Sequence, residues 1–305
     1  MRYYFAPMEG LTDRVFRRLH HQFFPGIDRY YMPFFSPTIH RQLTAREQLE
    51  LPKADSVGFT AIPQVLTKAA EDFVWMAQVC QDLGYPEINL NVGCPSGTVV
   101  AKGKGSGMLR DLAALDRFLE QIFEYSPIPI SVKTRIGMES AEEFPAILEI
   151  YNRYPIRELT IHPRPRSQFY NGKVDMDAFS YASEHSANPL CYNGDIRSLE
   201  QAQGLQAQYP QVQSIMIGRG LLADPGMLSG GTDIVKLEAF MDALLESYLQ
   251  EFGGSRNAMF RLKEHWSYLF PQYPGCEKLW KQLRKTTDLT QYQTITREFF
   301  ARVRG

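Results

Sequence analysis

Side chains that can bind ligands or transfer protons recur along the first 220 residues, each at or near the carboxyl end of a short apolar or β-branched run. They comprise a cysteine, a histidine, cations, amides and glycine-containing turns. In chain order they are Pro7 and Met8, Gln64, Asn91 and Cys94, Lys133 and Arg135, His162, then Asn193, Gly194 and Asp195, and finally Gly218 and Arg219. Any one of them could belong to an ordinary surface loop. Several of them converging on one mouth would instead form a ligand site.

The runs that carry these side chains at or near their carboxyl ends are predicted strands. Between them, residues 67–83 and 111–125 carry apolar side chains at three- and four-residue steps, and Asp111 and Ser198 are suitable helix N-caps. The predicted strands cover residues 3–6, 29–32, 61–66, 87–91, 129–134, 158–162, 190–193 and 214–217. This alternation over residues 1–231 indicates an α/β fold, a (β/α)8 TIM barrel, whose strands end on one catalytic face. An open doubly wound sheet is the alternative, but no glycine-rich fingerprint follows the first strand.

The last two groups of these residues, 193–195 and 218–219, favour a phosphate ligand. Asn193, Gly194 and Asp195, like Gly218 and Arg219, offer small residues and backbone N–H groups just before helices. Barrels bind phosphate after strands seven and eight in this way. Glycine lets the backbone approach an anion, and Arg219 adds positive charge. A phosphate-bearing cofactor such as FMN fits this pattern, and so does a sugar phosphate.

The chain changes character after Gly231. Residues 232–252, 256–270, 276–285 and 289–303 are amphipathic, so we expect a separate all-α helical domain over residues 232–305. Residues 255–305 hold ten Lys and Arg against four Asp and Glu, a net charge of +6, whereas the whole chain carries −1. Such a segment could steer a polyanion to the protein, or it could consist of solvated helix faces.

Other classes of protein are disfavoured by composition. The four cysteines are scattered without a CxxC pair, so neither a metal site nor disulfides are expected, and each cysteine is by default a small buried residue. No stretch approaches the ~20 apolar residues of a membrane helix. Pro7 and Glu9 interrupt any apolar leader, so we expect a cytoplasmic protein that needs no membrane. No feature of the sequence indicates an obligate protein partner.

Six motifs together resemble the tRNA-dihydrouridine synthase family, in the family's own order from Ala6 to Gly220. Asn-x-Gly-Cys-Pro is highly specific for that family, whereas Ala-Pro-Met is shared with other flavin barrels. The motifs are Ala-Pro-Met-Glu-Gly-Leu-Thr-Asp from residue 6, Asn-Leu-Asn-Val-Gly-Cys-Pro from 89, Ser-Val-Lys-Thr-Arg from 131, Ile-His-Pro-Arg from 161, Asn-Gly-Asp-Ile from 193 and Met-Ile-Gly-Arg-Gly from 216. The helical tail resembles the family's tRNA-binding domain.

This resemblance implies an FMN enzyme, reduced by NADPH, that reduces a uridine ring in tRNA. Hydride would pass from the flavin to uracil C6, and Cys94 would donate the proton to C5. A cysteine thiol, with an ordinary pKa near ~8.5, is protonated at neutral pH and can act as this acid. The implied FMN-binding residues are Pro7, Met8, Gln64, Lys133, His162, Asn193, Gly194, Asp195, Gly218 and Arg219. The implied substrate-binding residues are Asn91, Arg135 and Tyr170.

Some features depart from the family pattern or have two interpretations. Pro163 follows His162, and Tyr192 precedes Asn193, where relatives more often carry small residues. The glycine-rich loop 102–107 could close over the site or touch phosphates, or it could be a flexible linker. Trp266, Tyr268 and Trp280 could stack on bases, although helical periodicity favours core packing for most of them.

Two other functions remain open from the sequence. The protein could be a different FMN barrel that oxidises or reduces a small molecule, as a dihydroorotate-type dehydrogenase does. The basic helical appendage speaks against this, because a small substrate would not require it. It could also be a tRNA-binding protein without catalytic activity, which would not take up FMN.

Overall fold

The computed structural model describes residues 1–305 and contains one sheet of nine strands. The strands are β1 (Arg2–Phe5), β2 (Arg29–Tyr31), β3 (Ala61–Ile62), β4 (Gln64–Val65), β5 (Ile88–Val92), β6 (Ile130–Arg135), β7 (Leu159–His162), β8 (Leu190–Tyr192) and β9 (Ser214–Ile217). Their order is β3-β2-β1-β9-β8-β7-β6-β5-β4, and the neighbouring strands are parallel. All eight predicted strands are present, and the TIM-barrel prediction is confirmed.

The barrel closes at Pro63. β3 pairs with β2 and β4 pairs with β5, yet only this one residue separates β3 from β4. Proline has no N–H to donate to the ladder, so the predicted strand 61–66 is divided into two short pieces. The Pro63 carbonyl still accepts a hydrogen bond from Asn89 N at 2.8 Å. The two ends of the sheet are therefore joined through the chain itself.

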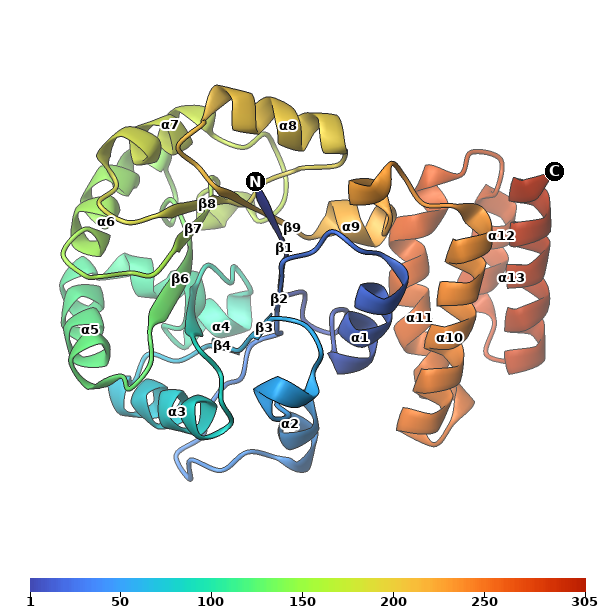
Figure 1. Ribbon diagram of the computed structural model, residues 1–305, viewed down its shortest axis with the longest axis horizontal. Helices are drawn as coiled ribbons and strands as arrows, with labels where there is room; N and C mark the ends of the chain where they lie inside the picture. Colours follow the sequence, from blue (N-terminus) through green and yellow to red (C-terminus); the bar gives the residue numbers. More distant parts are fainter. The chain divides into compact units, whose positions relative to one another are not determined.

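Helices surround the strands of the barrel (Figure 1). They are α2 (Ala45–Glu50), α3 (Ala70–Asp82), α4 (Gly97–Ala101), α5 (Leu112–Tyr125), α6 (Phe144–Tyr151), α7 (Met176–His185) and α8 (Leu199–Gln208). Side-chain caps fix where several of them begin. The Asp111 carboxylate accepts from Ala114 N at 2.9 Å, and the Ser198 hydroxyl accepts from Gln201 N at 3.2 Å. Both predicted N-caps are confirmed, and each satisfies a donor that the helix itself leaves unbonded.

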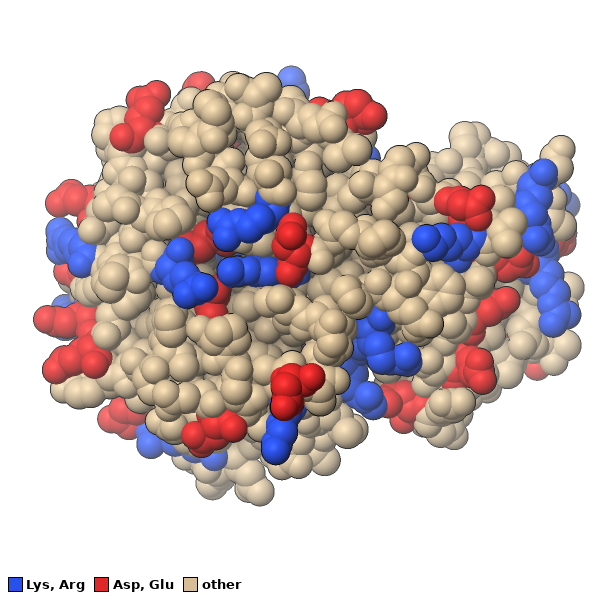
Figure 2. Space-filling view, in the orientation of Figure 1, with Lys and Arg blue, Asp and Glu red and all other residues tan.

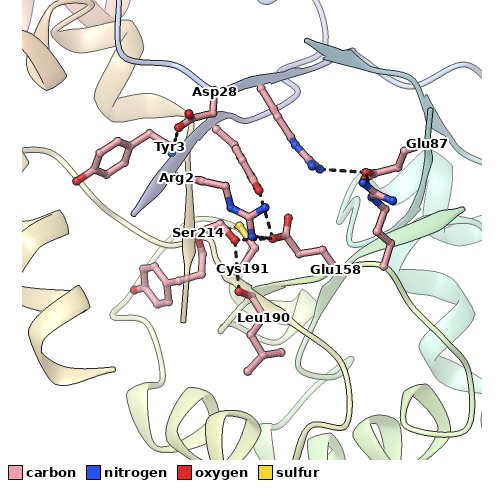
Figure 3. A network of polar contacts seen from close by, with 12 residues as sticks. Arg2, Tyr3, Asp28, Glu87, Glu158, Leu190, Cys191 and Ser214 are labelled. Atoms are coloured by element: carbon pink, nitrogen blue, oxygen red, sulfur yellow. Dashed lines mark hydrogen bonds and ion pairs between the residues drawn. The ribbon is translucent and has the colours of Figure 1, made fainter. Parts of the chain in front are cut away.

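Two buried carboxylates at the amino-terminal end of the barrel pair with arginines around them. Figure 2 shows basic and acidic side chains gathered at the centre of the barrel face that it presents. In Figure 3, Glu158 accepts from Ser214 at 2.6 Å and from Arg2 at 3.3 Å, which ties the start of β7 to β9 and β1. Glu87 similarly pairs with Arg29 at 3.0 Å and with Arg157 at 2.8 Å. Burial raises the pKa of the Glu158 carboxyl, whereas the hydrogen bond from Ser214 and the charges of Arg2 and Arg29 oppose that rise.

The chain divides into two compact units. The barrel unit comprises Met1–Pro7, Asp28–Asp195 and Ala202–Ile217, and the second unit comprises Met8–Ile27, Ile196–Gln201 and Gly218–Gly305. The helices of the second unit are α1 (Arg14–Phe23), α9 (Arg219–Ala223), α10 (Ile234–Phe252), α11 (Ser255–Leu269), α12 (Glu277–Lys285) and α13 (Leu289–Arg304). The four helices expected in the tail are therefore present. A division into catalytic and tRNA-binding domains between residues 231 and 232 stays a prediction.

Aromatic packing makes the core of the second unit. Trp266 is fully buried, and its indole N–H donates to the Tyr292 hydroxyl at 2.7 Å. Its ring also contacts Phe270 and Phe299 at centroid distances of 5.1 Å each. Trp266 is thus a core residue, as helical periodicity favoured. Trp280 is half-buried and stacks on Phe270 at 5.2 Å.

Two buried histidines should make the second unit sensitive to acid. Burial lowers the pKa of both His20 and His265 to about 3. The unfolded chain binds these protons near pH 6.5, so stability is complete above that pH and is lost as the pH falls from 6.5 towards 3. Each histidine should lower the free energy of unfolding by about 2 kcal/mol between pH 7 and pH 5.

Urea unfolding of the intact protein at pH 7 and pH 5 measures this loss of stability in the second unit. His265→Phe retains a flat ring against Phe16, which stacks on His265 at 4.8 Å, and should remove about half of the difference between the two pH values. Exposed His40 provides the control, because His40→Gln should leave the difference unchanged. An undiminished pH difference in His265→Phe would contradict the assignment.

Candidate active site

Asn91 near the end of β5 sets the position of Cys94. Its side-chain carbonyl accepts from Gly93 N at 3.0 Å and from Cys94 N at 2.9 Å. Its amide N–H donates to the Gln64 side-chain carbonyl at 2.7 Å. An amide offers a donor and an acceptor in one plane, so a single side chain can fix both the turn and its distance from β4. The turn leaves Cys94 partly exposed.

Gln64 is the centre of a buried amide chain. It is 0% exposed, and its amide nitrogen donates to Asn89 at 2.7 Å. Asn89 donates in turn to the Ser131 hydroxyl at 2.9 Å, so the chain crosses β4, β5 and β6. The structure therefore shows Gln64 as the support of Asn91. Its predicted contact with a flavin stays a prediction.

The loop after α4 supports Cys94 from its other side. Residues 105–110 form a short 3-10 helix, and both the backbone N–H and the hydroxyl of Ser106 donate to the Cys94 carbonyl, at 3.1 and 2.8 Å. Gly105 has a φ of +58°, and a Cβ atom there would lie 2.9 Å from the Cys94 oxygen. These residues are buried, so this part of the loop is neither a lid nor a flexible linker. Ser106 was missed in the sequence, where only the adjacent glycines signalled a close approach.

Two cations project from β6 beside these residues. Lys133 is the register partner of Asn91, and it makes no hydrogen bond and no ion pair. Burial first, and then the nearby Arg135 charge, lower the pKa of Lys133 to about 8. A partly buried cation without a counter-ion favours an electron-rich or anionic ligand.

Arg135 is fixed by backbone carbonyls. Its Nε donates to Gly93 O at 3.0 Å and its Nη1 to Pro165 O at 3.1 Å, while Nη2 is buried with no hydrogen-bond partner. The guanidinium lies 5.2 Å from the centroid of the Tyr170 ring, which is half exposed. An unsatisfied buried donor is costly, so Nη2 is suited to a ligand carbonyl.

His162 ends β7 opposite Arg135, and the loop after it accommodates Pro163. The Pro163 carbonyl accepts from Asp175 N at 2.7 Å, and Arg164 N donates to His162 O at 2.7 Å. The proline that departs from the family pattern is thus part of an ordered turn. The imidazole lies 6.0 Å from the Tyr170 ring.

The predicted phosphate residues lie in both units. After β8, Asn193 donates to Met216 O at 2.8 Å, and Asp195 pairs with Arg164. Gly194 has no room for a side chain, because a Cβ there would lie 2.7 Å from the Tyr192 hydroxyl and 2.8 Å from Val174. Tyr192 therefore fills the space beside this turn. Met8, Gly218 and Arg219 belong to the second unit, where Gly218 caps α9, and a shared phosphate site stays a prediction.

The barrel unit thus brings together seven of the fourteen predicted site residues. In register on β5, β6 and β7 and in their loops lie Asn91, Cys94, Lys133, Arg135, His162 and Tyr170, with Gln64 beneath them.

No group of three or more His, Cys, Asp or Glu residues could hold a metal ion. No helix combines the length and apolar character needed to cross a membrane.

Comparison with known proteins bears on the family and on the fold. A probable tRNA-dihydrouridine synthase from Rhizobium leguminosarum is 29% identical, over 90% of this chain and 87% of that protein. tRNA-dihydrouridine synthase B of Pasteurella multocida is 28% identical, over 82% and 74%. Among solved structures, morphinone reductase superimposes with a TM-score of 0.54 at 11% identity, over 75% of this chain and 84% of that one, which shows a shared barrel fold.

One protein family, described as Dihydrouridine synthase (Dus), matches residues 4–299, which is nearly the whole chain and includes every site residue described above. The cysteine turn at the end of β5 and the cations of β6 thus lie within the matched region. The chain belongs to the dihydrouridine synthase family.

Proposed function

We propose that this dihydrouridine synthase reduces the C5–C6 double bond of a uridine in tRNA, with FMN as hydride donor, NADPH as its reductant and Cys94 as proton donor. The family match and the tRNA-dihydrouridine synthase names of its relatives support the reaction. One observation carries the assignment of residues. Cys94 is held from both sides, by Asn91 and Ser106, on a barrel face where Lys133 has no counter-ion.

The residues present fit a flavin. When bound, FMN would supply the hydride that reaches uracil C6. Lys133 provides a cation with no competing acceptor, which would stabilise negative charge on the N1 and O2 side of the flavin ring. We assign Pro7, Met8, Gln64 and His162 to the ring, and Asn193, Gly194, Asp195, Gly218 and Arg219 to the phosphate.

Arg135 would hold the uracil, and Asn91 would contribute the second of its two amide N–H groups, since only one is donated to Gln64. The spare Nη2 of Arg135 can donate to a uracil carbonyl, and Tyr170 presents a half-exposed ring above the same guanidinium. Because Nε and Nη1 are fixed by backbone carbonyls, the direction of Nη2 is fixed as well. The pyrimidine would thus be oriented before Cys94 delivers its proton to C5.

A uridine inside folded tRNA must be unstacked to reach this face, at a cost of a few kcal/mol. The basic face of α12 can contribute to the binding energy that offsets this cost. Lys278, Lys281 and Lys285 follow at helical spacing, with Arg284 beside them, and all four are exposed while Leu279 and Leu283 are buried. Phosphate contacts from such a face are independent of sequence and sensitive to salt.

Removing the Cys94 thiol should stop proton transfer without emptying the flavin site. We expect Cys94→Ala to form dihydrouridine about 100-fold more slowly or worse, while binding FMN normally. Single-turnover reduction of tRNA transcripts, quantified by mass spectrometry, measures this. Buried Cys276 in the second unit serves as the control, and Cys276→Ala should retain the wild-type rate. A full rate in Cys94→Ala would end the proton-donor assignment; turnover of small molecules but not of tRNA would overturn the proposed substrate.

A side chain added next to the Cys94 carbonyl should slow the reaction, because it displaces Cys94 without changing its thiol. Gly105→Ala places a methyl group against the Cys94 carbonyl at a φ that disfavours alanine, so Cys94 should shift and the rate should fall about 10-fold or more. Gly97→Ala is the matched change, because its Cβ would meet nothing within 4 Å. Equal rates in the two variants would show that the position of Cys94 does not depend on Gly105.

Charge reversal on α12 should weaken binding of tRNA and spare the chemistry. For Arg284→Glu with Lys285→Glu we expect a higher Kd for tRNA, and the slope of log K against log salt should become shallower by about 0.7–0.9 for each tRNA phosphate that the variant no longer neutralises. Flavin reduction by NADPH should be unaffected. Arg117→Glu on the exposed side of α5 is the control. An unchanged Kd would remove α12 from the tRNA surface.

A further inference from the structure

Arg164 is a fully buried cation in the loop after β7. Its side chain is 0% exposed, and it is surrounded by acceptors from its own loop and from the loop after β8. Nε donates to Asn171 O at 3.1 Å, Nη2 donates to Gly172 O at 2.6 Å and pairs with the Asp195 carboxylate, and Nη1 lies 3.0 Å from His162 Nε2. A buried charge of this kind persists only when its donors are satisfied.

The guanidinium is oriented independently of His162. Two backbone carbonyls and one carboxylate fix Nε and Nη2, and the group is planar, so the direction of Nη1 follows. Asp195 is itself held at a φ of +24°, a conformation that non-glycine residues rarely adopt. A strained backbone conformation persists where surrounding contacts hold it in place, and the pairing with Arg164 is such a contact.

A guanidinium can only donate hydrogen bonds. The Nε2 atom that faces Nη1 at 3.0 Å must therefore carry a lone pair, and a neutral ring then has its proton on Nδ1. Protonating Nε2 would point an N–H at an N–H and add a positive charge beside a buried cation. Arg135, the register partner of His162 on β6, is a second cation on this side, and the Tyr170 ring is a further neighbour.

We propose that Arg164, braced by Asp195, is a positioning residue that locks His162 in its neutral Nδ1–H tautomer. His162 then acts as a hydrogen-bond donor through Nδ1 and is not available as an acid. This rests on the proposed function in one respect: the reaction needs one proton donor, and the lock leaves that role to Cys94. The tautomer itself is a property of the protein alone.

The tautomer can be read directly from nitrogen shifts. Protein labelled with 15N-histidine, prepared without FMN and again with FMN, is examined by two-bond 1H–15N correlation between pH 5 and pH 8. The chain has six histidines, and loss of one pattern in His162→Gln assigns the signal. We expect wild-type His162 to show a protonated Nδ1 and an unprotonated Nε2 across this range, with no titration.

Two variants test the cause. Arg164→Gln should give a mixture of tautomers and a titration near the ordinary histidine value of about 6.5, with signals of exposed His40 unchanged. If Arg164→Gln does not fold, Asp195→Asn keeps the arginine and loosens its brace, and it should allow partial exchange between tautomers.

Either of two results would overturn the proposal: an Nε2–H or doubly protonated His162 in the wild type at pH 7, or a wild-type pattern that persists in the folded variant. Neither depends on activity towards tRNA. A protein that makes no dihydrouridine but shows the locked tautomer would refute the proposed function and leave the lock standing.

Discussion

The candidate site depends on one side-chain amide. Asn91 links the buried chain of Gln64 and Asn89 to the turn that presents Cys94. The carbonyl of Asn91 accepts from two backbone N–H groups, and one of its two amide N–H groups is donated to Gln64, so the orientation of the amide is fixed. Cys94 therefore owes its position to hydrogen bonds that a rigid parallel sheet holds in register. Ser106 and Gly105 complete the support from the other side.

The cations at the carboxyl ends of β6 and β7 differ in which acceptors bind their N–H groups. Arg164 has carbonyls and a carboxylate, Arg135 has carbonyls and one spare nitrogen, and Lys133 has neither. The difference distinguishes a structural cation from one that can bind a ligand, because a buried cation is stable only when its N–H groups have hydrogen-bond acceptors. Arg164 is saturated by the protein, and the other two retain capacity for a ligand. At the amino-terminal end of the barrel, Glu87 and Glu158 pair with three arginines, although each carboxylate keeps one buried oxygen without a hydrogen-bond partner.

Most strand ends were predictable because each is encoded locally. An apolar run followed by a polar or glycine residue marks a strand and its end, and parallel pairing then brings those ends to one face. The role of Gln64 was harder to predict, because its partner Asn91 is 27 residues away and the geometry of an amide chain has no sequence signature. The support from Ser106 was missed for the same reason, since a loop with three glycines is equally typical of a linker.

The sequence by itself determined the barrel, the helical tail and the family, and it singled out Cys94 as the candidate proton donor, because periodicity and a rare motif are properties of the chain. Only the tertiary structure decided what orients that cysteine, which cation lacks a counter-ion and which nitrogen of His162 carries its proton. These properties depend on contacts between residues far apart in the chain, such as Arg164 with Asp195. The tertiary structure also placed Met8–Ile27 in the helical unit, which no local pattern indicated. Burial and hydrogen-bond saturation arise only when the strands are closed into a barrel.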